Sequence, residues 1–467
     1  MSTWSRADWV ALAAVVGVAA LLRLAGLGHP AAFVFDETFY VPAACRLALG
    51  PQPECGGPSP ADVHPPLGKW LIALGIAVFG FNPVGWRISA AVAGTLTVGL
   101  LFVTARWLLR STLSATIAAS LLALDFLHFV HSRIGMLDAF LVLFTVAVLA
   151  CWSLDREDSD PDHRTVRTRF WHLVRPWRMG AGLATGAAIA TKWSGAFVAA
   201  TAIVLTLLVE LPRIRRSPDG RAGRQAPTVA SVALWLVAVP LLVYTLTHIG
   251  TVGGRWLAWP WAEDAWLRAI VDEQVRLARL HPAVGKTHPL RSAPWQWLFS
   301  PPPLPYFVQR VGETTFATIQ ALGTPAWGPG VIALAVVAGR AVRHTRAASL
   351  HAALLVAFGL TYLPWFGVAR IRTVFLFHFL PTVPILYLLM AAALTPVPRR
   401  PATRAGLVAL AAAMPLAFGM FRPVLTAAPL AYTACCRSVA TFVIRSLPDC
   451  ALVSAQPLPL RDRADPC

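Results

Sequence analysis

Charged side chains are scarce in this chain of 467 residues. Asp, Glu, Lys and Arg together make up 13% of it, about half the fraction that is typical of a soluble domain. Hydrophobic residues account for 57%, and the mean hydropathy is +0.61. The apolar residues fall into blocks of about 17–25, the length that crosses a bilayer core as a helix. This composition excludes a soluble protein.

Acidic residues are the scarcer charge, with 22 Asp and Glu against 40 Lys and Arg and a formal net charge of +18. In a soluble protein such an excess would suggest a nucleic-acid partner. Here the arginines cluster in short segments between apolar blocks, and orientation in a membrane explains that placement more simply. We therefore expect no nucleic-acid binding.

The chain also lacks a recognisable cleavable signal, a repeat of 20–50 residues, a coiled coil and a globular appendage. Its first apolar block, residues 9–27, is too long for a signal-peptide core and has no convincing small-residue cleavage site before Asp36. We expect this block to remain as the first membrane helix.

The apolar blocks predict an all-α polytopic membrane protein with about eleven spans. A further apolar segment, residues 67–81, lies between prolines and suits an interfacial or re-entrant helix. The eleven predicted spans are 8–27, 84–108, 112–130, 136–154, 179–192, 194–211, 228–249, 326–343, 349–366, 373–395 and 404–422.

The basic loops predict the orientation of these spans. If the N-terminus is cytoplasmic, every Arg-rich loop after an even-numbered span lies inside, as the positive-inside rule requires. The segments 28–83, 131–135, 250–325 and 423–467 then lie outside the cytoplasm. We expect a multi-pass membrane domain over residues 1–430, with outer loops 28–83 and 250–325, followed by a Cys-containing outer tail, 431–467.

Cysteine is also sparse, with seven residues in all. This topology places six of them outside, where an oxidising compartment permits disulfides. Cys45 and Cys55 form the obvious local pair, whereas the pairing of Cys435, Cys436, Cys450 and Cys467 cannot be deduced. Unpaired thiols are the alternative.

Two adjacent acids, Asp36 and Glu37, open the first outer loop among aromatic residues. Acids at a membrane surface are costly to desolvate, and like charges side by side raise one pKa toward the range of a general base. The alternative is an exposed pair that caps the following helix. His64, held by two following prolines, could polarise a substrate oxygen, bind a metal or satisfy a loop carbonyl.

Several cations are predicted at the same outer face. Arg133 could grip a phosphate and Asp138 could orient it, although snorkelling of Arg133 to headgroups is the alternative. Lys192, in a short outer turn, is a second candidate anion ligand. Arg372 belongs to an outer Arg pair that departs from the positive-inside bias. Two acids and several cations suit a reaction that releases a lipid-borne phosphate.

Ordered motifs over residues 36–381 carry a resemblance to a known family. They are Asp36-Glu37, His64-Pro-Pro-Leu-Gly-Lys69, Ser132-Arg133 to Leu137-Asp138, Gly182 to Lys192-Trp193, His288 to Trp297, Gly323-Thr-Pro325 and Pro364-Trp365 to Pro381. This combination resembles the protein O-mannosyltransferases, membrane enzymes of the GT-C fold that use polyprenyl- or dolichyl-phosphate mannose. Gly323-Thr-Pro325 departs from the Asn that usually precedes this proline, and the long sugar-binding-like module of eukaryotic members has no counterpart.

The resemblance implies a GT-C fold and an inverting transfer of mannose to Ser or Thr hydroxyls of exported proteins. Asp36 would activate the acceptor, Glu37 would support positioning, and Arg133 would lie near the donor phosphate, with Lys192 and Arg372 as weaker phosphate ligands. A carboxylate and an arginine, Asp36 and Arg133, should therefore meet at the outer leaflet. No cofactor beyond the lipid-linked donor is expected. A divalent metal is possible through Asp36, Glu37 and His64 but is not predicted.

Two other functions are compatible with parts of the sequence. The same fold could move a lipid-linked sugar onto a lipid or glycan. A secondary transporter is less favoured, because the acids lie at a loop edge and no repeated halves are visible. The Arg- and Ala-rich composition suggests a high-GC bacterium, in which such enzymes would be coupled to the protein secretion machinery.

Overall fold

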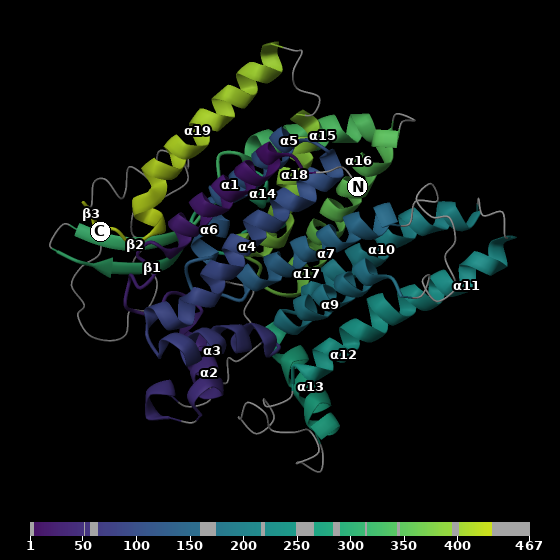
Figure 1. Cartoon of the computed structure of the whole chain (residues 1–467). Helices are drawn as coiled ribbons and strands as arrows, with labels where there is room; N and C mark the ends of the chain where they lie inside the picture. The colour runs from purple at the N-terminus through teal and green to yellow at the C-terminus, as the bar shows by residue number, and fades with distance from the viewer. Residues whose placement is uncertain are drawn as a thin grey trace.

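The computed structural model describes residues 4–50, 52–56, 64–158, 174–215, 220–248, 266–283, 290–312, 315–342, 346–394 and 401–431. Long helices run side by side through the middle of the molecule (Figure 1). A small sheet and helices α2 (Glu37–Leu49) and α3 (Leu67–Phe79) lie at one end of these helices, and the junction of α10 (Gly195–Arg215) with α11 (Gly220–Ala233) lies at the other. The active-site candidates gather at the first end.

Within the described residues, eight helices are long and apolar enough to cross a membrane. They are α1 (Arg6–Leu24), α4 (Pro83–Leu109), α7 (Asp138–Asp158), α10, the run from α11 through the π-helical η3 (Leu234–Ala238) to α12 (Val239–Leu246), the pair α16 (Arg346–Tyr362) and α17 (Pro364–Ile371), the pair η5 (Leu376–Thr382) and α18 (Val383–Leu394), and α19 (Pro401–Leu425). A multi-pass membrane protein is therefore confirmed, and the count of eleven spans is not.

The remaining predicted spans coincide with shorter helices. Residues 179–192 and 326–343 correspond to α9 (Pro176–Thr191) and α15 (Trp327–Ala341). The prediction of one continuous span over 112–130 is wrong. The chain leaves α5 (Thr112–Ala123) and restarts as the short helix α6 (Phe126–His131), because the Asp125 side chain accepts a hydrogen bond of 2.8 Å from the His128 N–H as an N-cap.

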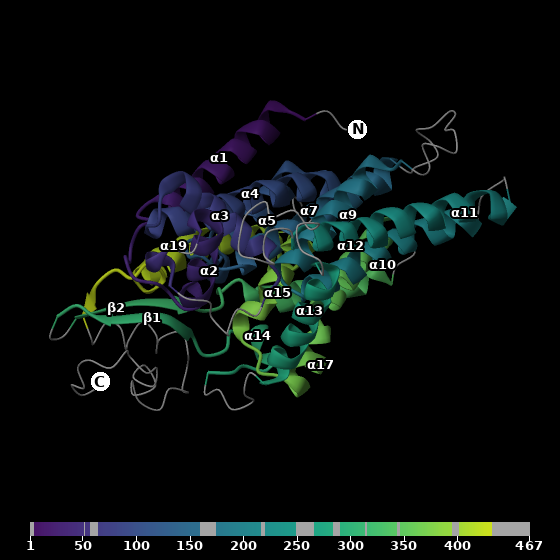
Figure 2. The same cartoon turned by 90° about the horizontal axis from the view of Figure 1, so that it is seen from below.

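A three-stranded antiparallel sheet interrupts the otherwise helical architecture, so the strictly all-α expectation needs correction. It has the order β1 (Leu304–Arg310), β2 (Thr315–Ala321), β3 (Leu430–Ala431). Aromatic and β-branched residues in β1 and β2 suit a half-buried sheet. In Figures 1 and 2 the sheet lies beside the bundle, with β3 and α19 on the β2 side.

A β-bulge shapes the first strand. Pro305 pairs with Gln320 and Phe307 with Ile319, so Tyr306 is left without a partner in β2. Bulges often redirect a side chain at functional sites. Here the unpaired residue is one of the contacts of the predicted acid loop.

Three further elements belong to the described residues. They are η1 (Pro53–Cys55), α13 (Trp266–Ala283) and α14 (Pro294–Trp297). The predicted disulfide between Cys45 of α2 and Cys55 of η1 is confirmed, with a Cα–Cα distance of 5.3 Å. Cys435, Cys436, Cys450 and Cys467 lie outside the described residues.

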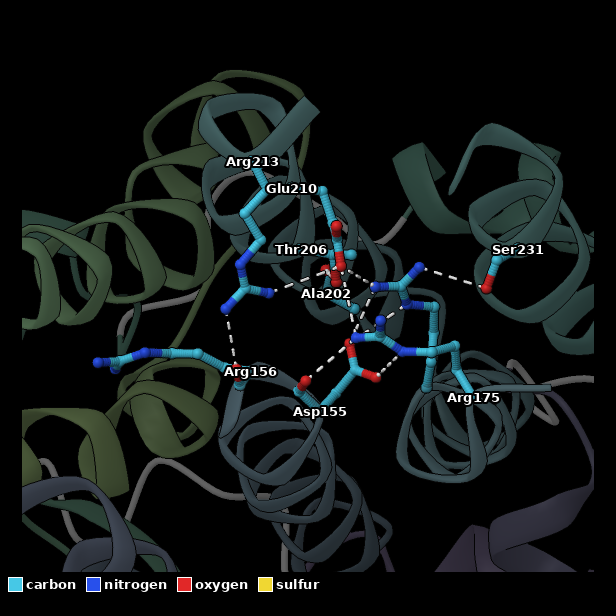
Figure 3. A network of polar contacts seen from close by, with 9 residues as sticks. Asp155, Arg156, Arg175, Ala202, Thr206, Glu210, Arg213 and Ser231 are labelled. Carbon is cyan, nitrogen blue, oxygen red and sulfur yellow. Dashed lines mark hydrogen bonds and ion pairs between the residues drawn. The ribbon is translucent and has the colours of Figure 1, made fainter. Parts of the chain in front are cut away.

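At the end of the helices opposite to the sheet, a buried ion-pair network holds neighbouring helices together (Figure 3). Arg178 on α9 contacts Asp155 on α7 at 3.0 Å, Glu210 on α10 at 2.8 Å and the hydroxyl of Ser231 on α11 at 3.2 Å. Arg175 adds a contact to Asp155 at 2.8 Å. The predicted cytoplasmic arginines therefore include members that hold four helices together.

Candidate active site

Asp36 stands at the start of α2 and is half-buried. Its side chain makes no capping hydrogen bond, which removes the helix-cap alternative. The hydroxyl of Tyr40, one helical turn later, donates a hydrogen bond of 3.1 Å to Asp36 Oδ2. The carboxyl group is thus oriented from its own helix and remains partly accessible.

The residue before Asp36 is held in an unusual conformation. Phe35 has a φ of 52°, in the left-handed region that residues with a Cβ rarely adopt. Its N–H donates a hydrogen bond of 3.1 Å to the carbonyl of Tyr306, and the two rings stack with centroids 4.2 Å apart. The bulged strand β1 therefore fixes the backbone that presents Asp36. Backbone strain of this kind is characteristic of functional sites.

The electrostatic surroundings of Asp36 differ from the expected ones. Burial raises the pKa of Asp36 to about 6, the nearby Lys192 and the Tyr40 hydroxyl oppose that rise, and Asp138 adds to it. The sequence predicted a raised pKa through repulsion from the adjacent Glu37. The direction agrees, but burial and not Glu37 is the cause.

Glu37 is fully buried and points away from this site into a structural ion pair. Arg87 on α4 donates to both of its oxygens, each at 2.8 Å. The N–H groups of Val34 and Gly135 also donate to it, at 2.8 and 2.6 Å. These contacts hold the loop before Asp36 onto α4 and leave Glu37 without access to a substrate, so its expected part in catalysis reduces to positioning the loop.

Lys192 and Asp138 form a buried ion pair next to Asp36. Lys192 Nζ lies 2.9 Å from Asp138 Oδ1 and 2.8 Å from Oδ2, and 5.3 Å from the centre of the Phe377 ring. Asp138 Oδ2 is 3.8 Å from His131 Nδ1, and His131 Nε2 is 2.8 Å from the Tyr306 hydroxyl. Polar residues of β1, α6, α7 and the end of α9 therefore lie next to one another, although the His131–Asp138 contact is too long for a hydrogen bond.

Arg133 does not join Asp36, contrary to the expected meeting of the two side chains. Its Nη1 donates to the carbonyls of Leu22, Arg23 and Ala25 at 2.7–2.9 Å, and its Nη2 donates to Gly26 at 2.9 Å. The guanidinium caps the end of α1, where unsatisfied carbonyls attract a cation. Asp138, expected to orient Arg133, instead binds Lys192.

Arg372 and His64 both lie near the Asp36–Tyr40 pair. Arg372 follows α17 and interacts electrostatically with Asp36 and Tyr40. The His64 ring centre is 5.8 Å from that of Tyr40. The structure thus brings Asp36, Asp138, Lys192, Arg372 and His64 to one region, while Arg133 and Glu37 stabilise the elements around it.

Aromatic side chains of η5 and α17 pack together beside the site. The His378 ring stacks on Phe377 at 4.5 Å and lies 4.4 Å from Trp365. Aromatic faces of this kind suit the apolar side of a sugar ring or a prenyl chain. The sequence had pointed to this segment for its arginines, and the structure adds the packing of its aromatic rings.

Three contact residues were not selected from the sequence: Tyr40, His131 and Tyr306. Tyr40 could have been selected from the sequence, because its spacing of four from Asp36 brings the two residues onto one helical face. His131 directly precedes the quoted motif that begins at Ser132. No sequence signal pointed to Tyr306, because its contacts with Phe35 and His131 span more than 170 residues.

This geometry defines a membrane transferase site with one accessible carboxyl group and two cations, Lys192 and Arg372, near it. A carboxylate can remove a proton from a hydroxyl, and cations stabilise a phosphate as it leaves. Within the described residues, no three His, Cys, Asp or Glu side chains gather in a way that could hold a metal ion.

Comparison with known proteins agrees with this class. The pattern of dolichyl-phosphate-mannose-protein mannosyltransferases matches residues 80–252, and that of the C-terminal four-span region of protein-O-mannosyltransferases matches residues 266–441. Polyprenol-phosphate-mannose–protein mannosyltransferases are 31% identical in Mycolicibacterium smegmatis, over 82% of this chain and 81% of the relative, and 32% identical in Corynebacterium glutamicum, over 84% and 83%.

Solved structures share the fold at low identity. The Saccharomyces cerevisiae protein O-mannosyltransferase Pmt1–Pmt2 complex matches with a TM-score of 0.73 and 14% identity, over 94% of this chain and 92% of that one. ArnT from Cupriavidus metallidurans matches with 0.54 and 18%, over 94% and 70%. The GT-C fold is thus confirmed. The chain is a glycosyltransferase and belongs to the polyprenol-phosphate-mannose–protein mannosyltransferase family.

Proposed function

We propose that this protein transfers mannose, with inversion, from polyprenyl-phosphate mannose to Ser or Thr hydroxyls of exported proteins at the outer face of the membrane. The observation that carries the proposal is the half-buried Asp36, next to Lys192 and Arg372 and bonded to Tyr40. Family membership supports the donor and the acceptor, since the relatives are named for both.

In the proposed reaction, the acceptor oxygen attacks the anomeric carbon as the bond from that carbon to the phosphate oxygen breaks. Asp36 accepts the hydroxyl proton and later passes it to water. Lys192 and Arg372 offset the negative charge that develops on the departing polyprenyl phosphate. Asp138 holds the Lys192 ammonium in place.

The outer location rests on the predicted topology and on the Cys45–Cys55 disulfide close to Asp36 in sequence. Disulfides persist in oxidising compartments, and a site outside the cytoplasm would meet its acceptor as it leaves the secretion machinery. The lipid-linked donor then supplies the sugar without a soluble nucleotide. We propose that the transfer needs no divalent metal, because Lys192 and Arg372 supply the positive charge.

The direct test is an assay of purified protein with polyprenyl-phosphate mannose and a Ser/Thr peptide, with and without a chelator. We expect transfer by the wild type, insensitivity to the chelator, and a loss of about 10²–10⁴-fold in kcat in Asp36→Asn, the size of a general-base contribution. Glu54→Gln, an exposed acid of the same loop, is the matched control and should retain activity. Unchanged turnover in Asp36→Asn would remove that residue from the base role, and transfer only to a lipid or glycan would replace the acceptor.

A further inference from the structure

The open edge of β1 lies directly beside the acid loop. Among the described residues, β1 is an edge strand of the sheet β1-β2-β3, and in Figure 1 the side of β1 away from β2 also faces away from β3 and α19. The strand runs from buried Leu304, Pro305 and Tyr306 to exposed Gln309 and Arg310. It therefore leads from the surface to the active site.

The backbone direction along this edge follows from the pairing on the other side of β2. The Thr318 carbonyl accepts a hydrogen bond of 3.2 Å from Ala427, so the Thr318 backbone faces away from β1. Its cross-strand partner is Val308. In an antiparallel pair, when the backbone N–H and C=O of one residue face away from the partner strand, those of the residue directly opposite do so too. The N–H and C=O of Val308 therefore point to the open edge. Within the described residues they have no backbone partner.

One rung of a strand pairing already exists on this edge. The outward carbonyl of Tyr306 accepts the N–H of Phe35 at 3.1 Å, and Phe35 precedes Asp36. Val308 is the next outward-facing residue, about 7 Å farther along the strand. A chain bonded at Val308 would therefore continue the row of hydrogen bonds that begins at Phe35 and would bring a side chain toward Asp36.

We propose that β1 binds the acceptor as an extended polypeptide through the backbone of Val308, so that strand addition delivers the Ser or Thr hydroxyl to Asp36. This proposal rests on the proposed function and specifies the form of its acceptor. Strand addition obtains affinity from main-chain hydrogen bonds. Such a surface accepts many sequences and requires that the acceptor segment be unfolded.

The alternation of a strand provides a distinctive test on the peptide. A Ser/Thr acceptor peptide is N-methylated at one backbone amide at a time and assayed with the full-length protein. Since every second amide of a paired strand faces its neighbour, we expect methylation at alternate positions to raise the peptide KM about tenfold, the effect of one lost hydrogen bond. Methylation at the intervening positions should change KM less than twofold.

The protein side offers a matched pair of variants. Val308→Pro removes the outward N–H at an edge position where proline is tolerated, whereas Val308→Ala keeps it. We expect Val308→Pro to raise the peptide KM about tenfold with the donor KM unchanged, and Val308→Ala, which keeps the N–H, to raise the peptide KM much less. Unchanged donor KM shows that Val308→Pro is folded.

The two proposals fail in different ways. Transfer that is indifferent to the position of the N-methyl group, or an equal peptide KM in Val308→Pro and Val308→Ala, would overturn strand addition and leave the mannosyltransferase function intact. Absence of transfer to any peptide by the wild type would overturn both.

Discussion

At the residue scale, Asp36 owes its chemistry to its surroundings. An ordinary Asp is ionised at any physiological pH, but burial raises the pKa of this one to about 6. A carboxylate with a pKa nearer neutrality is a stronger base and still largely ionised at pH 7. Tyr40 and the conformation of Phe35 fix its orientation.

This raised pKa predicts the pH dependence of transfer. The base must be deprotonated, so kcat/KM should be level above about pH 7 and fall tenfold per pH unit below pH 6. A profile measured from pH 4.5 to 8 with saturating donor checks this, and Glu54→Gln should give the same curve. A profile that stays level down to pH 4.5 would show that Asp36 keeps an ordinary pKa or is not the base.

At the element scale, buried charges hold the helices at both ends. At the end that holds Asp36, Glu37 and Arg87 attach the acid loop to α4, and Arg133 attaches the end of α1 to the segment after α6. At the other end Arg178 joins α7, α9, α10 and α11 (Figure 3). Such pairs add specificity to helix packing, because a displaced helix would leave a buried charge unpaired.

The Arg178 network predicts a large stability difference between two arginine variants. Arg178→Ala leaves Asp155 and Glu210 with less compensation and should cost about 3–5 kcal/mol. Arg110→Ala removes a pair with Glu157 whose side chains are 63% and 30% exposed, and should cost about 0–1 kcal/mol. Thermal unfolding of both variants in detergent measures the contrast. Equal midpoints would mean that the network contributes little to stability.

At the scale of the whole molecule, two ends with different chemistry lie on opposite sides of a helical bundle. The disulfide, the sheet and Asp36 share one end, and the Arg-rich ion-pair network occupies the other. This polarity agrees with the distribution of arginines along the chain. Because the two ends differ, labelling one exposed position at each end can determine the orientation in the membrane.

Cysteine labelling should reveal that orientation. With Cys151 and the four tail cysteines replaced by Ala, Gln309→Cys on β1 should react with a membrane-impermeant maleimide in intact cells. Arg110→Cys, at the end of α4, should react only after permeabilisation. Both positions are exposed, so accessibility within the fold is matched. The reverse pattern would place the active site in the cytoplasm.

The sequence by itself determined the features that depend on local composition. Apolar runs and Arg-rich loops predicted a multi-pass helical protein, ordered motifs predicted the family, and Cys45–Cys55 predicted a disulfide that the structure contains. Asp36, Lys192, Asp138 and Arg372 were also selected from the sequence, and they interact in the structure. These signals are local because hydrophobic length and residue type act over one helix or one loop at a time.

Only the tertiary structure decided which charges meet. Arg133 and Glu37 have the residue types of active-site groups, yet Arg133 caps α1 and Glu37 binds Arg87. Asp138 forms an ion pair with Lys192 and not with Arg133. Tyr306 reaches the acid loop from a strand far along the chain, through a bulge that no local pattern announces. Pairing between distant buried groups depends on how the helices and the sheet pack, and one-dimensional spacing does not contain that information.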